Sequence, residues 1–314
     1  MTKLSIALLS GGISSERDVS IASGNQVYET LDRDKYEVIR YDPKTDLPQL
    51  VADAAGIDAA LIILHGPYGE DGTVQGLLDL LGIPYQGSGV LGSAISMNKL
   101  VSKQLYKNAG IPVAPDMTFK SIDMIETRAV VDQLGMPLVI KPVTSGSSIG
   151  LSIVKSEDAL NDALEKAFAE DHEVLIESYI KGVELTGGVL GNDDLLALPI
   201  IEIIPGEDFE FFDYTAKYTP GATQEICPAR IDEAMTQKAQ TYAKKAHRAL
   251  CCKGYSRTDM ILSDGQIYVL ETNTIPGMTP TSLLPQAAGV AGIDFSRLLD
   301  KLIEFSLEDK KSGR

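Results

Sequence analysis

The chain has 314 residues, of which 44% are hydrophobic and 23% charged, and its formal net charge is −16. This length exceeds one ordinary hydrophobic core, so we expect two or three globular domains. The negative charge argues against nucleic acid or an anionic membrane as partner, and any phosphate site must concentrate positive charge locally. No stretch approaches the roughly 20 apolar residues of a membrane span. The three cysteines, Cys227, Cys251 and Cys252, have no framework spacing, which favours a reducing cytoplasm.

The first third of the chain alternates predicted strands and helices. Strands are expected at Leu4–Leu9, Val38–Tyr41 and Ala59–Leu64, and helices over Val19–Leu31 and from Thr73. This alternation predicts a parallel sheet with helices on both faces. In open sheets of this type the ligand-binding loops follow the carboxyl ends of the strands. The segments Ser10–Arg17 and His65–Gly72 occupy those positions, so we expect both to line one cleft.

The middle third contains a loop rich in Ser, Thr and Gly. Its elements are expected as a helix over Lys99–Ala109, a strand Pro137–Lys141, the loop Val143–Gly150, a helix over Glu157–Ala169 capped by Ser156, and a strand Val174–Glu177. Backbone N–H groups of such a loop can wrap phosphate oxygens, and Lys141 at its base adds charge. A plain flexible loop is the alternative.

The last third begins with strands at Glu184–Leu190 and Leu196–Ile204. Five segments follow. They are a polar and aromatic excursion at Pro205–Cys227, a helix over Asp232–Cys251, a hairpin from Arg257 to Asn273, a Pro-rich loop at Ile275–Pro285 and a closing helix over Phe295–Leu307. Connections as long as the first of these are usually lids or disordered segments. Its aromatic run Phe211–Tyr218 favours a lid.

The hairpin carries the most informative residues of the chain. Arg257-Thr-Asp259 precedes the turn signal Asp264-Gly265, and Glu271-Thr-Asn273 follows it. Two carboxylates and a carboxamide are hard oxygen ligands of the kind that suits Mg²⁺ held together with nucleotide phosphates. The alternative is that these acids only line a solvated hairpin.

The register of this hairpin decides between the two interpretations. A two-residue loop at Asp264-Gly265 would pair Asp259 with Leu270 and turn Asp259 away from Glu271. A three-residue loop over Ser263–Gly265 returns Asp259 to the face of Glu271 and Asn273. We predict the three-residue loop.

Other polar residues have both a binding and a structural interpretation. Glu16, after the first strand, could bind an ammonium group, and His65 by itself is typical of a capping or core histidine. Glu177 and Glu184 could bond an adenine amino group and a ribose hydroxyl, or could be surface acids that flank a turn. Lys99 by itself is typical of a surface helix.

Taken together, the motifs resemble one family. In order they are Gly11-Gly12-x-Ser14-x-Glu16-Arg17, His65-Gly66-x-x-Gly69-Glu70-Asp71-Gly72, Asn98-Lys99, Lys141-Pro142, Gly146-Ser147-Ser148-x-Gly150, Phe212-Asp213-Tyr214, Lys217-Tyr218, Arg257-x-Asp259, Glu271-x-Asn273 and Pro276-Gly277-Met278-Thr279. This set is similar to the D-alanine–D-alanine ligases of the ATP-grasp superfamily, and the resemblance covers essentially the whole chain. One departure is Ser145, where many members have Glu.

The resemblance implies a fold of the α/β and α+β classes with three domains. These are a Rossmann-like N-terminal domain over 1–95, a central ATP-grasp subdomain over 96–183, and a C-terminal ATP-grasp domain over 184–314 with a lid at 205–227. It also implies a cytoplasmic homodimer that uses ATP as co-substrate with two Mg²⁺ ions, or Mn²⁺. The implied reaction joins two D-alanine molecules through an acyl phosphate, for peptidoglycan precursor synthesis.

The resemblance also implies a role for each candidate residue. Asp259, Glu271 and Asn273 would hold the metal ions. The nucleotide would be bound by Lys99, Lys141, Ser148, Glu177, Tyr179, Ile180, Glu184 and Lys217. The amino-acid substrates would be bound by Glu16, His65, Arg257, Gly277, Ser282 and Leu283. Catalysis would involve Glu16, Ser147, Tyr218 and Arg257.

Three other functions are alternatives to this one. Another ligase of this fold could join D-alanine to D-serine or couple other amino acids, although Tyr218 favours an amine over a hydroxyl nucleophile. A non-catalytic nucleotide-binding regulator is disfavoured because the presumed metal ligands and Arg257 are all present. A dinucleotide-dependent oxidoreductase is disfavoured because Gly11-Gly12 lacks the Gly-x-Gly-x-x-Gly fingerprint.

Overall fold

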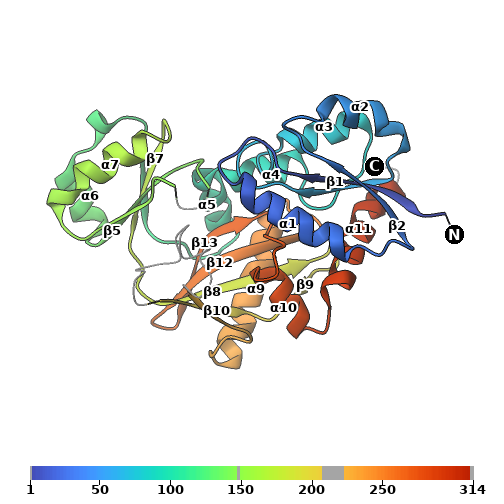
Figure 1. Cartoon of the computed structure of the whole chain (residues 1–314). Coiled ribbons are helices and arrows are strands. Elements are labelled where there is room, and N and C mark those ends of the chain that lie inside the picture. Colours follow the sequence, from blue (N-terminus) through green and yellow to red (C-terminus); the bar gives the residue numbers. More distant parts are fainter. Residues whose placement is uncertain (1, 147–148, 207–222, 312–314) are drawn as a thin grey trace.

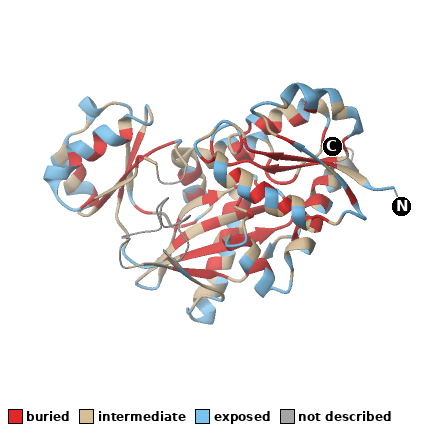
Figure 2. Ribbon diagram, in the orientation of Figure 1, coloured by how far each residue is buried: buried red, intermediate tan, exposed pale blue. Residues whose placement is uncertain are grey.

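Three β-sheets, each covered by helices, organise the chain in the computed structural model (Figure 1). The structure describes residues 2–146, 149–206 and 223–311, with side chains up to residue 308. Buried residues concentrate in the strands and on the helix faces that cover them (Figure 2). The fold therefore combines a parallel α/β layer with two antiparallel sheets, which confirms the predicted fold class.

The first sheet is parallel and has the strand order β2-β1-β3. Its strands are β1 Leu4–Ser10, β2 Tyr36–Tyr41 and β3 Ala59–Ile63. Alternate residues of β1 enter different cores, Ile6 and Leu8 on one face and Ala7 and Leu9 on the other. Both faces of the strand are thus buried, as expected for a parallel sheet covered on two sides.

Helices cover the two faces of the first sheet. They are α1 Arg17–Thr30, α2 Leu47–Asp53, α3 Thr73–Leu81, α10 Leu283–Val290 and α11 Phe295–Lys311. Residues of α2 and α3 share the core of Ala7, whereas α1, α10 and α11 share the core of Ile6. Two hydrogen bonds attach α11 to the start of β2. Asp300 accepts one from Tyr36 Oη and one from Nζ of the preceding residue, Lys35, each at 2.8 Å. The end of the chain therefore packs against its beginning.

The second sheet is antiparallel and forms a lobe beside the rest of the molecule (Figure 1, left). Its order is β4-β7-β5-β6, with bounds β4 Asp116–Phe119, β5 Leu138–Pro142, β6 Ser152–Val154 and β7 Val174–Ser178. The helices α6 Thr127–Leu134 and α7 Leu160–Phe168 share a core with one of its faces. Val139 and Ile153 on the other face line a cavity that the third sheet also lines.

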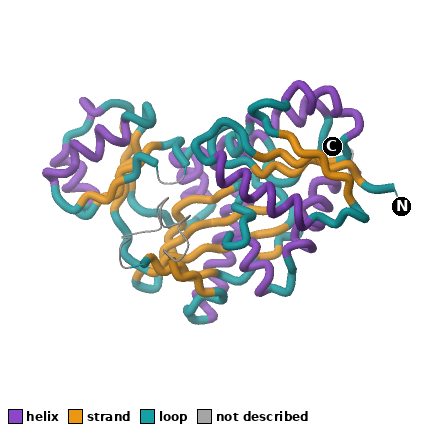
Figure 3. Tube along the Cα trace, viewed as in Figure 1, coloured by secondary structure: helices purple, strands orange, loops and turns teal. Residues whose placement is uncertain are grey.

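The third sheet is also antiparallel and follows the order β11-β10-β8-β12-β13, with β9 paired to β8. Its strands are β8 Val183–Leu190, β9 Leu196–Ala197, β10 Ile201–Pro205, β11 Thr223–Ile226, β12 Tyr255–Ser263 and β13 Gln266–Asn273. Helix α9, Glu233–Ala249, covers one face with the buried residues Ala239, Ala243 and Ala246 (Figure 3). Helices α4 Val90–Met97 and α5 Lys99–Asn108 contact β13 at the edge.

The predicted three-residue hairpin loop is wrong, although its consequence is confirmed. Ser263 pairs with Gln266, so the loop is the two residues Asp264 and Gly265, both with positive φ. A β-bulge then shifts the register between Asp259 and Met260, so that Met260 pairs with Val269 and Asp259 with Glu271. The extra residue Leu270 corrects the register that a two-residue loop alone would give.

Some local expectations are also corrected. Ser156 makes no side-chain cap, and the helix starts with a 3₁₀ turn over Glu157–Ala159 before α7. The strand expected at Leu196–Ile204 is divided into β9 and β10, and α10 begins inside the predicted Pro-rich loop. Cys251 is exposed and Cys252 buried, and all three cysteines are free thiols.

The proposed domain boundaries at 95/96 and 183/184 remain a prediction. Helices α10 and α11, which the prediction assigns to the third domain, share a hydrophobic core with the first sheet. None of the helices in the described part of the chain is both long and apolar enough to cross a membrane.

The hairpin turn should be sensitive to a side chain at Gly265. Gly265 has φ +74°, and a methyl group there would meet open space, so strain would come from the backbone alone. Gly265→Ala should lower the free energy of unfolding by roughly 1–2 kcal/mol, measured by urea denaturation. Gly289 in α10 has the same open space and no positive φ, and Gly289→Ala should raise stability by roughly 0.5–1 kcal/mol. Equal effects of the two substitutions would contradict this account.

Candidate active site

Two adjoining cavities bring most of the predicted residues together. The first, about 440 Å³, lies between the loops of the first sheet, the start of α5, the hairpin and the segment before α10. The second, about 160 Å³, lies between the second and third sheets. Lys99, Ser145 and Glu271 line both. A ligand that fills the second cavity can therefore reach a ligand in the first.

Two loops at the carboxyl ends of β1 and β3 form one wall of the first cavity. Glu16 stands directly before α1, and Ser14 Oγ donates to the His65 carbonyl at 2.7 Å. Gly66, with φ +71°, lies so close that a Cβ there would be 2.7 Å from Glu16 Oε2. The expected meeting of these two loops in one cleft is confirmed, and the positive φ of Gly66 favours glycine at that position.

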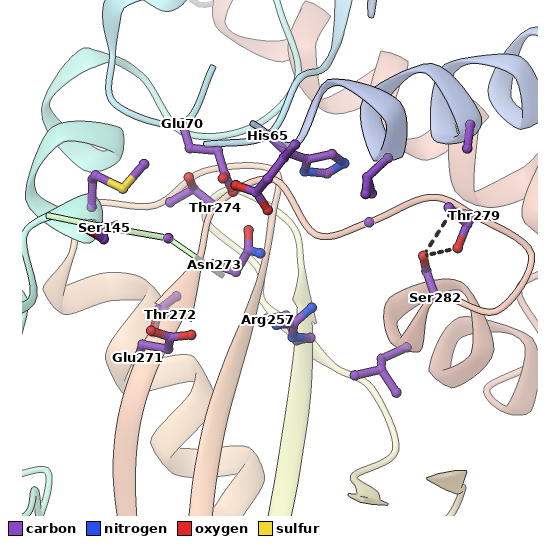
Figure 4. A pocket seen from close by; sticks show the side chains of 18 of the residues that line it. His65, Glu70, Ser145, Arg257, Glu271, Thr272, Asn273, Thr274, Thr279 and Ser282 are labelled. Atoms are coloured by element: carbon purple, nitrogen blue, oxygen red, sulfur yellow. Dashed lines mark hydrogen bonds between the residues drawn. The ribbon is translucent and has the colours of Figure 1, made fainter. Parts of the chain in front are cut away.

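Burial sets the charge of two side chains in this wall. Burial, and to a lesser degree the Arg257 guanidinium, lowers the pKa of His65 to about 4. Burial and the negative charge of Glu16 raise the pKa of Glu70 to about 8, although Glu70 Oε2 accepts from the Gly66 N–H at 2.6 Å. At neutral pH the His65 imidazole is thus neutral and the Glu70 carboxyl group largely protonated. Figure 4 shows the two side chains close together at the cavity.

The hairpin forms the opposite wall with the predicted metal ligands. Arg257 donates from Nε and Nη2 to the two oxygens of Asp259, both at 2.9 Å. Thr186 on β8 donates to Asp259 Oδ1 at 2.6 Å, and Asn273 Oδ1 accepts from the Ile275 N–H at 2.8 Å. The guanidinium is thereby fixed beside the carboxylates and points into the cavity (Figure 4).

A turn before α10 closes the first cavity. Ser282 Oγ accepts from the Thr279 N–H at 2.9 Å and lies 2.8 Å from Thr279 Oγ1 (Figure 4). A Cβ at Gly277 would lie 2.8 Å from Ser282 Oγ. Leu283 begins α10 and lines the first cavity, and a helix N-terminus favours a bound anionic group.

The second cavity has a charged end. Lys141 Nζ lies 2.7 Å from Glu177 Oε2, and Lys103 contacts the other oxygen. Burial opposes ionisation of Glu177, but the two ammonium groups outweigh it and lower the pKa of the carboxyl to about 2. Glu177 is therefore a permanent hydrogen-bond acceptor at the cavity wall.

The remaining lining of the second cavity is mostly apolar and suits a flat ring. Val139, Ile149, Leu151 and Ile153 come from the second sheet and its loop, Tyr179 and Ile180 from the connection to the third sheet, and Glu184 from β8. Gly182 in that connection lets the chain pass close to β12, because a Cβ there would be 2.2 Å from the Leu262 carbonyl oxygen. An apolar slot with an acceptor at its edge is typical of a base-binding pocket.

The segment around Ser145 is held from two sides. Lys99 Nζ donates to the Ser145 carbonyl. The Thr144 N–H and Oγ1 both donate to Asp171 Oδ2 at 2.7 Å. The start of the phosphate-loop candidate is thus fixed to α5 on one side and to the chain after α7 on the other.

The donor set at the hairpin fits a hard divalent cation. Asp259, Glu271 and Asn273 supply oxygen donors from directly paired or adjacent positions on β12 and β13. Among the described residues no group of three His, Cys, Asp or Glu side chains gathers as a metal site. Two carboxylates and an amide leave coordination positions open, which agrees with a cation that also binds phosphate.

The described residues thus include most of the predicted site. Glu16, His65, Arg257, Asn273, Gly277, Ser282 and Leu283 line the first cavity, whereas Lys141, Glu177, Tyr179, Ile180, Glu184 and Asp259 line the second. Ser147, Ser148, Lys217 and Tyr218 lie outside the described residues.

Sequence reasoning missed four residues at or beside the cavities. Glu70 and Glu225 line the first cavity, Thr186 orients Asp259, and Lys103 contacts Glu177. Two of them had a usable signal. Glu70 belongs to the motif that begins at His65, and Lys103 follows Lys99 by one helical turn.

Comparison with known proteins identifies the family. A model described as "D-ala D-ala ligase C-terminus" matches residues 105–304, and one described as "D-ala D-ala ligase N-terminus" matches residues 40–88. The chain belongs to the D-alanine–D-alanine ligase family. It is 64% identical over 307 residues to the D-alanine–D-alanine ligase of Syntrophobacter fumaroxidans, covering 98% of this chain and 99% of that protein.

Solved structures of this ligase family agree with the fold. The D-alanine–D-alanine ligase of Bacillus anthracis complexed with ATP matches with a TM-score of 0.87 and 40% identity, over 99% of this chain and all of that one. The VanG D-Ala:D-Ser ligase of Enterococcus faecalis matches with a TM-score of 0.84 and 34% identity, over 97% and 100%. The family therefore contains relatives with different second substrates.

The raised pKa of Glu70 predicts a specific pH dependence of stability. The folded protein holds the Glu70 proton up to about pH 8, whereas the unfolded chain releases it near the ordinary carboxyl value of 4.5. The contribution of the protonated Glu70 to the free energy of unfolding is present in full below pH 4.5, and it is lost as the pH rises through about 8. The Tm of the native protein should therefore fall across this window more than that of Glu70→Gln, which stays neutral. Parallel Tm curves from pH 5 to 9 would contradict the assignment.

Proposed function

We propose that this ligase joins two D-alanine molecules at the expense of ATP, with the nucleotide in the second cavity and the amino acids in the first. The observation that carries the proposal is the junction at Lys99 and Glu271, which line both cavities. The product would be D-alanyl-D-alanine for peptidoglycan precursors. ADP and phosphate would be the other products.

The first step would activate a poor acyl donor. A carboxylate oxygen of the first D-alanine attacks the γ-phosphorus of ATP, the bond to the β-phosphate oxygen breaks, and an acyl phosphate and ADP result. Such a transfer needs charge neutralisation and in-line positioning more than covalent help from the protein. Lys99 and Lys141 supply positive charge at the phosphates, and Glu16 holds the substrate ammonium group.

Asp259, Glu271 and Asn273 would hold two Mg²⁺ ions, or Mn²⁺, at this junction. When bound, the ions neutralise phosphate charge and polarise the transferred group. The chain itself prepares the ligands, since Thr186 and Arg257 orient Asp259 and the bulge at Leu270 places Glu271 opposite it.

The second step would form the amide bond. The amine of the second D-alanine attacks the acyl carbon, and phosphate leaves from the tetrahedral intermediate. Arg257 and the Gly277 N–H stabilise the developing oxyanion. Removing one donor of this type typically costs about 10²–10³ in rate. Ser282 and the Leu283 N–H bind the carboxylate of the second substrate.

Four predicted residues lie outside the described part of the chain and complete the proposal. Ser147 and Tyr218 would be hydrogen-bonded with Glu16 and would keep a lid closed over the acyl phosphate, which excludes water. Ser148 and Lys217 would contact the nucleotide phosphates. We further propose that the protein is cytoplasmic, which the free thiols support. The family resemblance supports a homodimer.

The identity of the second substrate needs a direct test. ADP release should be measured with a panel of D- and L-amino acids, alone and in pairs. D-alanine alone should give the highest rate. A preference for D-serine as second substrate would contradict D-alanine as that substrate and would match the activity named for the D-Ala:D-Ser relative. Activity with L-amino acids only would overturn the whole proposal.

Glu271→Gln should abolish most of the turnover while leaving the fold intact. Replacing even the outer partners of a metal ligand lowers metal affinity or activity by about 10–100-fold, so loss of a ligand should cost more than about 100-fold in kcat. The matched control is Asp264→Asn, which removes an exposed carboxylate from the turn of the same hairpin and should change kcat by less than about twofold. Near-normal turnover of Glu271→Gln would refute the metal role.

A further inference from the structure

Helix α5 carries three lysines on successive turns, and their contacts differ. Lys99 donates to the Ser145 carbonyl, Lys103 contacts Glu177 and lies 3.4 Å from Asp116, and Lys107 lies 2.5 Å from Asp116. Residues spaced by four lie on one helix face. Of the three, Lys99 lines both cavities of the site, whereas Lys103 and Lys107 line neither.

Lys103 is nearly completely buried, with 5% of its surface exposed. It faces two acids, because Asp116 on β4 pairs directly with Glu177 on β7. Like charges in directly opposite positions of an antiparallel pair destabilise the sheet. The Lys103 ammonium lies between the two carboxylates and offsets their repulsion.

Lys141 also contacts Glu177, but this contact competes with the proposed function. Its ammonium lies 2.7 Å from Glu177 Oε2 and lines the second cavity. A bound triphosphate draws the same ammonium toward its oxygens. Without another cation, Glu177 would then be a buried carboxylate with no positive partner, which strongly favours protonation.

We propose that Lys103 is a positioning residue for base recognition, which keeps the Glu177 carboxylate charged and oriented toward the exocyclic amine of adenine. The proposal rests on the proposed function, in which Glu177 accepts from that amine. Lys103 does not line the second cavity, so it acts through Glu177 and not by touching the nucleotide. The protein would thereby select nucleotides that have an amino group at the purine 6-position.

The test compares the binding of two nucleotides by isothermal titration calorimetry, which needs no turnover. ADP and purine riboside 5′-diphosphate differ only in the 6-amino group. The native protein should bind ADP about 10–100-fold more tightly, the range of a hydrogen bond to a charged acceptor. In Lys103→Met this ratio should fall to about threefold or less, and in Lys103→Arg, which keeps the charge, it should recover most of the native value.

Lys107→Met is the matched control, since Lys107 is on the same helix and contacts Asp116 but not Glu177. Its ratio should equal that of the native protein. A native ratio in Lys103→Met, or an equal fall in Lys107→Met, would overturn the proposal. If Lys103→Met does not fold, Lys103→Gln gives the same comparison with a side chain that stays polar.

The native protein separates this proposal from the function on which it rests. Discrimination between the two diphosphates without ADP formation from ATP and D-alanine would refute the ligase activity alone. ADP formation without discrimination would leave the ligase activity standing and overturn the role given to Glu177 and Lys103.

Discussion

Asp259 and Glu271 face each other across β12 and β13, and carboxylates in directly opposite positions repel. The chain offsets this repulsion with donors from neighbouring positions, because Arg257 and Thr186 both bond to Asp259. The second sheet has the same arrangement, where Asp116 faces Glu177 and lysines of α5 and β5 approach. Glu177 and the facing pair Asp259 and Glu271 line the second cavity, and Lys99 and Lys141 supply positive charge there within a chain of net charge −16.

The hairpin shows which features of the site can be predicted from the sequence and which cannot. The ligand residues and their common face follow from period-two spacing and from the requirement that Asp259 meet Glu271. The loop length does not follow, since a three-residue loop and a two-residue loop with a bulge both place Asp259 on the face of Glu271. The first would pair Asp259 with Val269, and the second pairs it with Glu271. The structure has the two-residue loop with the bulge. Strand β12 also pairs with β8 along its other edge, and the local sequence of the hairpin does not predict that contact.

Two of the residues that were missed, Lys103 and Thr186, have partners that lie far away in the sequence. Lys103 and Glu177 are 74 residues apart, and Thr186 and Asp259 are 73 apart. Helical spacing places Lys103 on the same helix face as Lys99, but it does not predict that this face contacts the second sheet. In contrast, strands such as β1 and β3 were predictable because continuous apolar runs require burial on both faces whatever the partner is.

The charges at the junction of the cavities also bear on the order of events. Arg257 is bonded through two nitrogens to Asp259, and Lys141 is paired with Glu177. Both cations are those that the proposed reaction needs at the substrate oxyanion and at the phosphates. Phosphates near Lys141 would draw its ammonium away from Glu177, whereas the bonds from Arg257 keep Asp259 oriented as a proposed metal ligand. Assembly of the phosphate side of the site would then follow nucleotide binding, since Lys141 is paired with Glu177 until the nucleotide arrives.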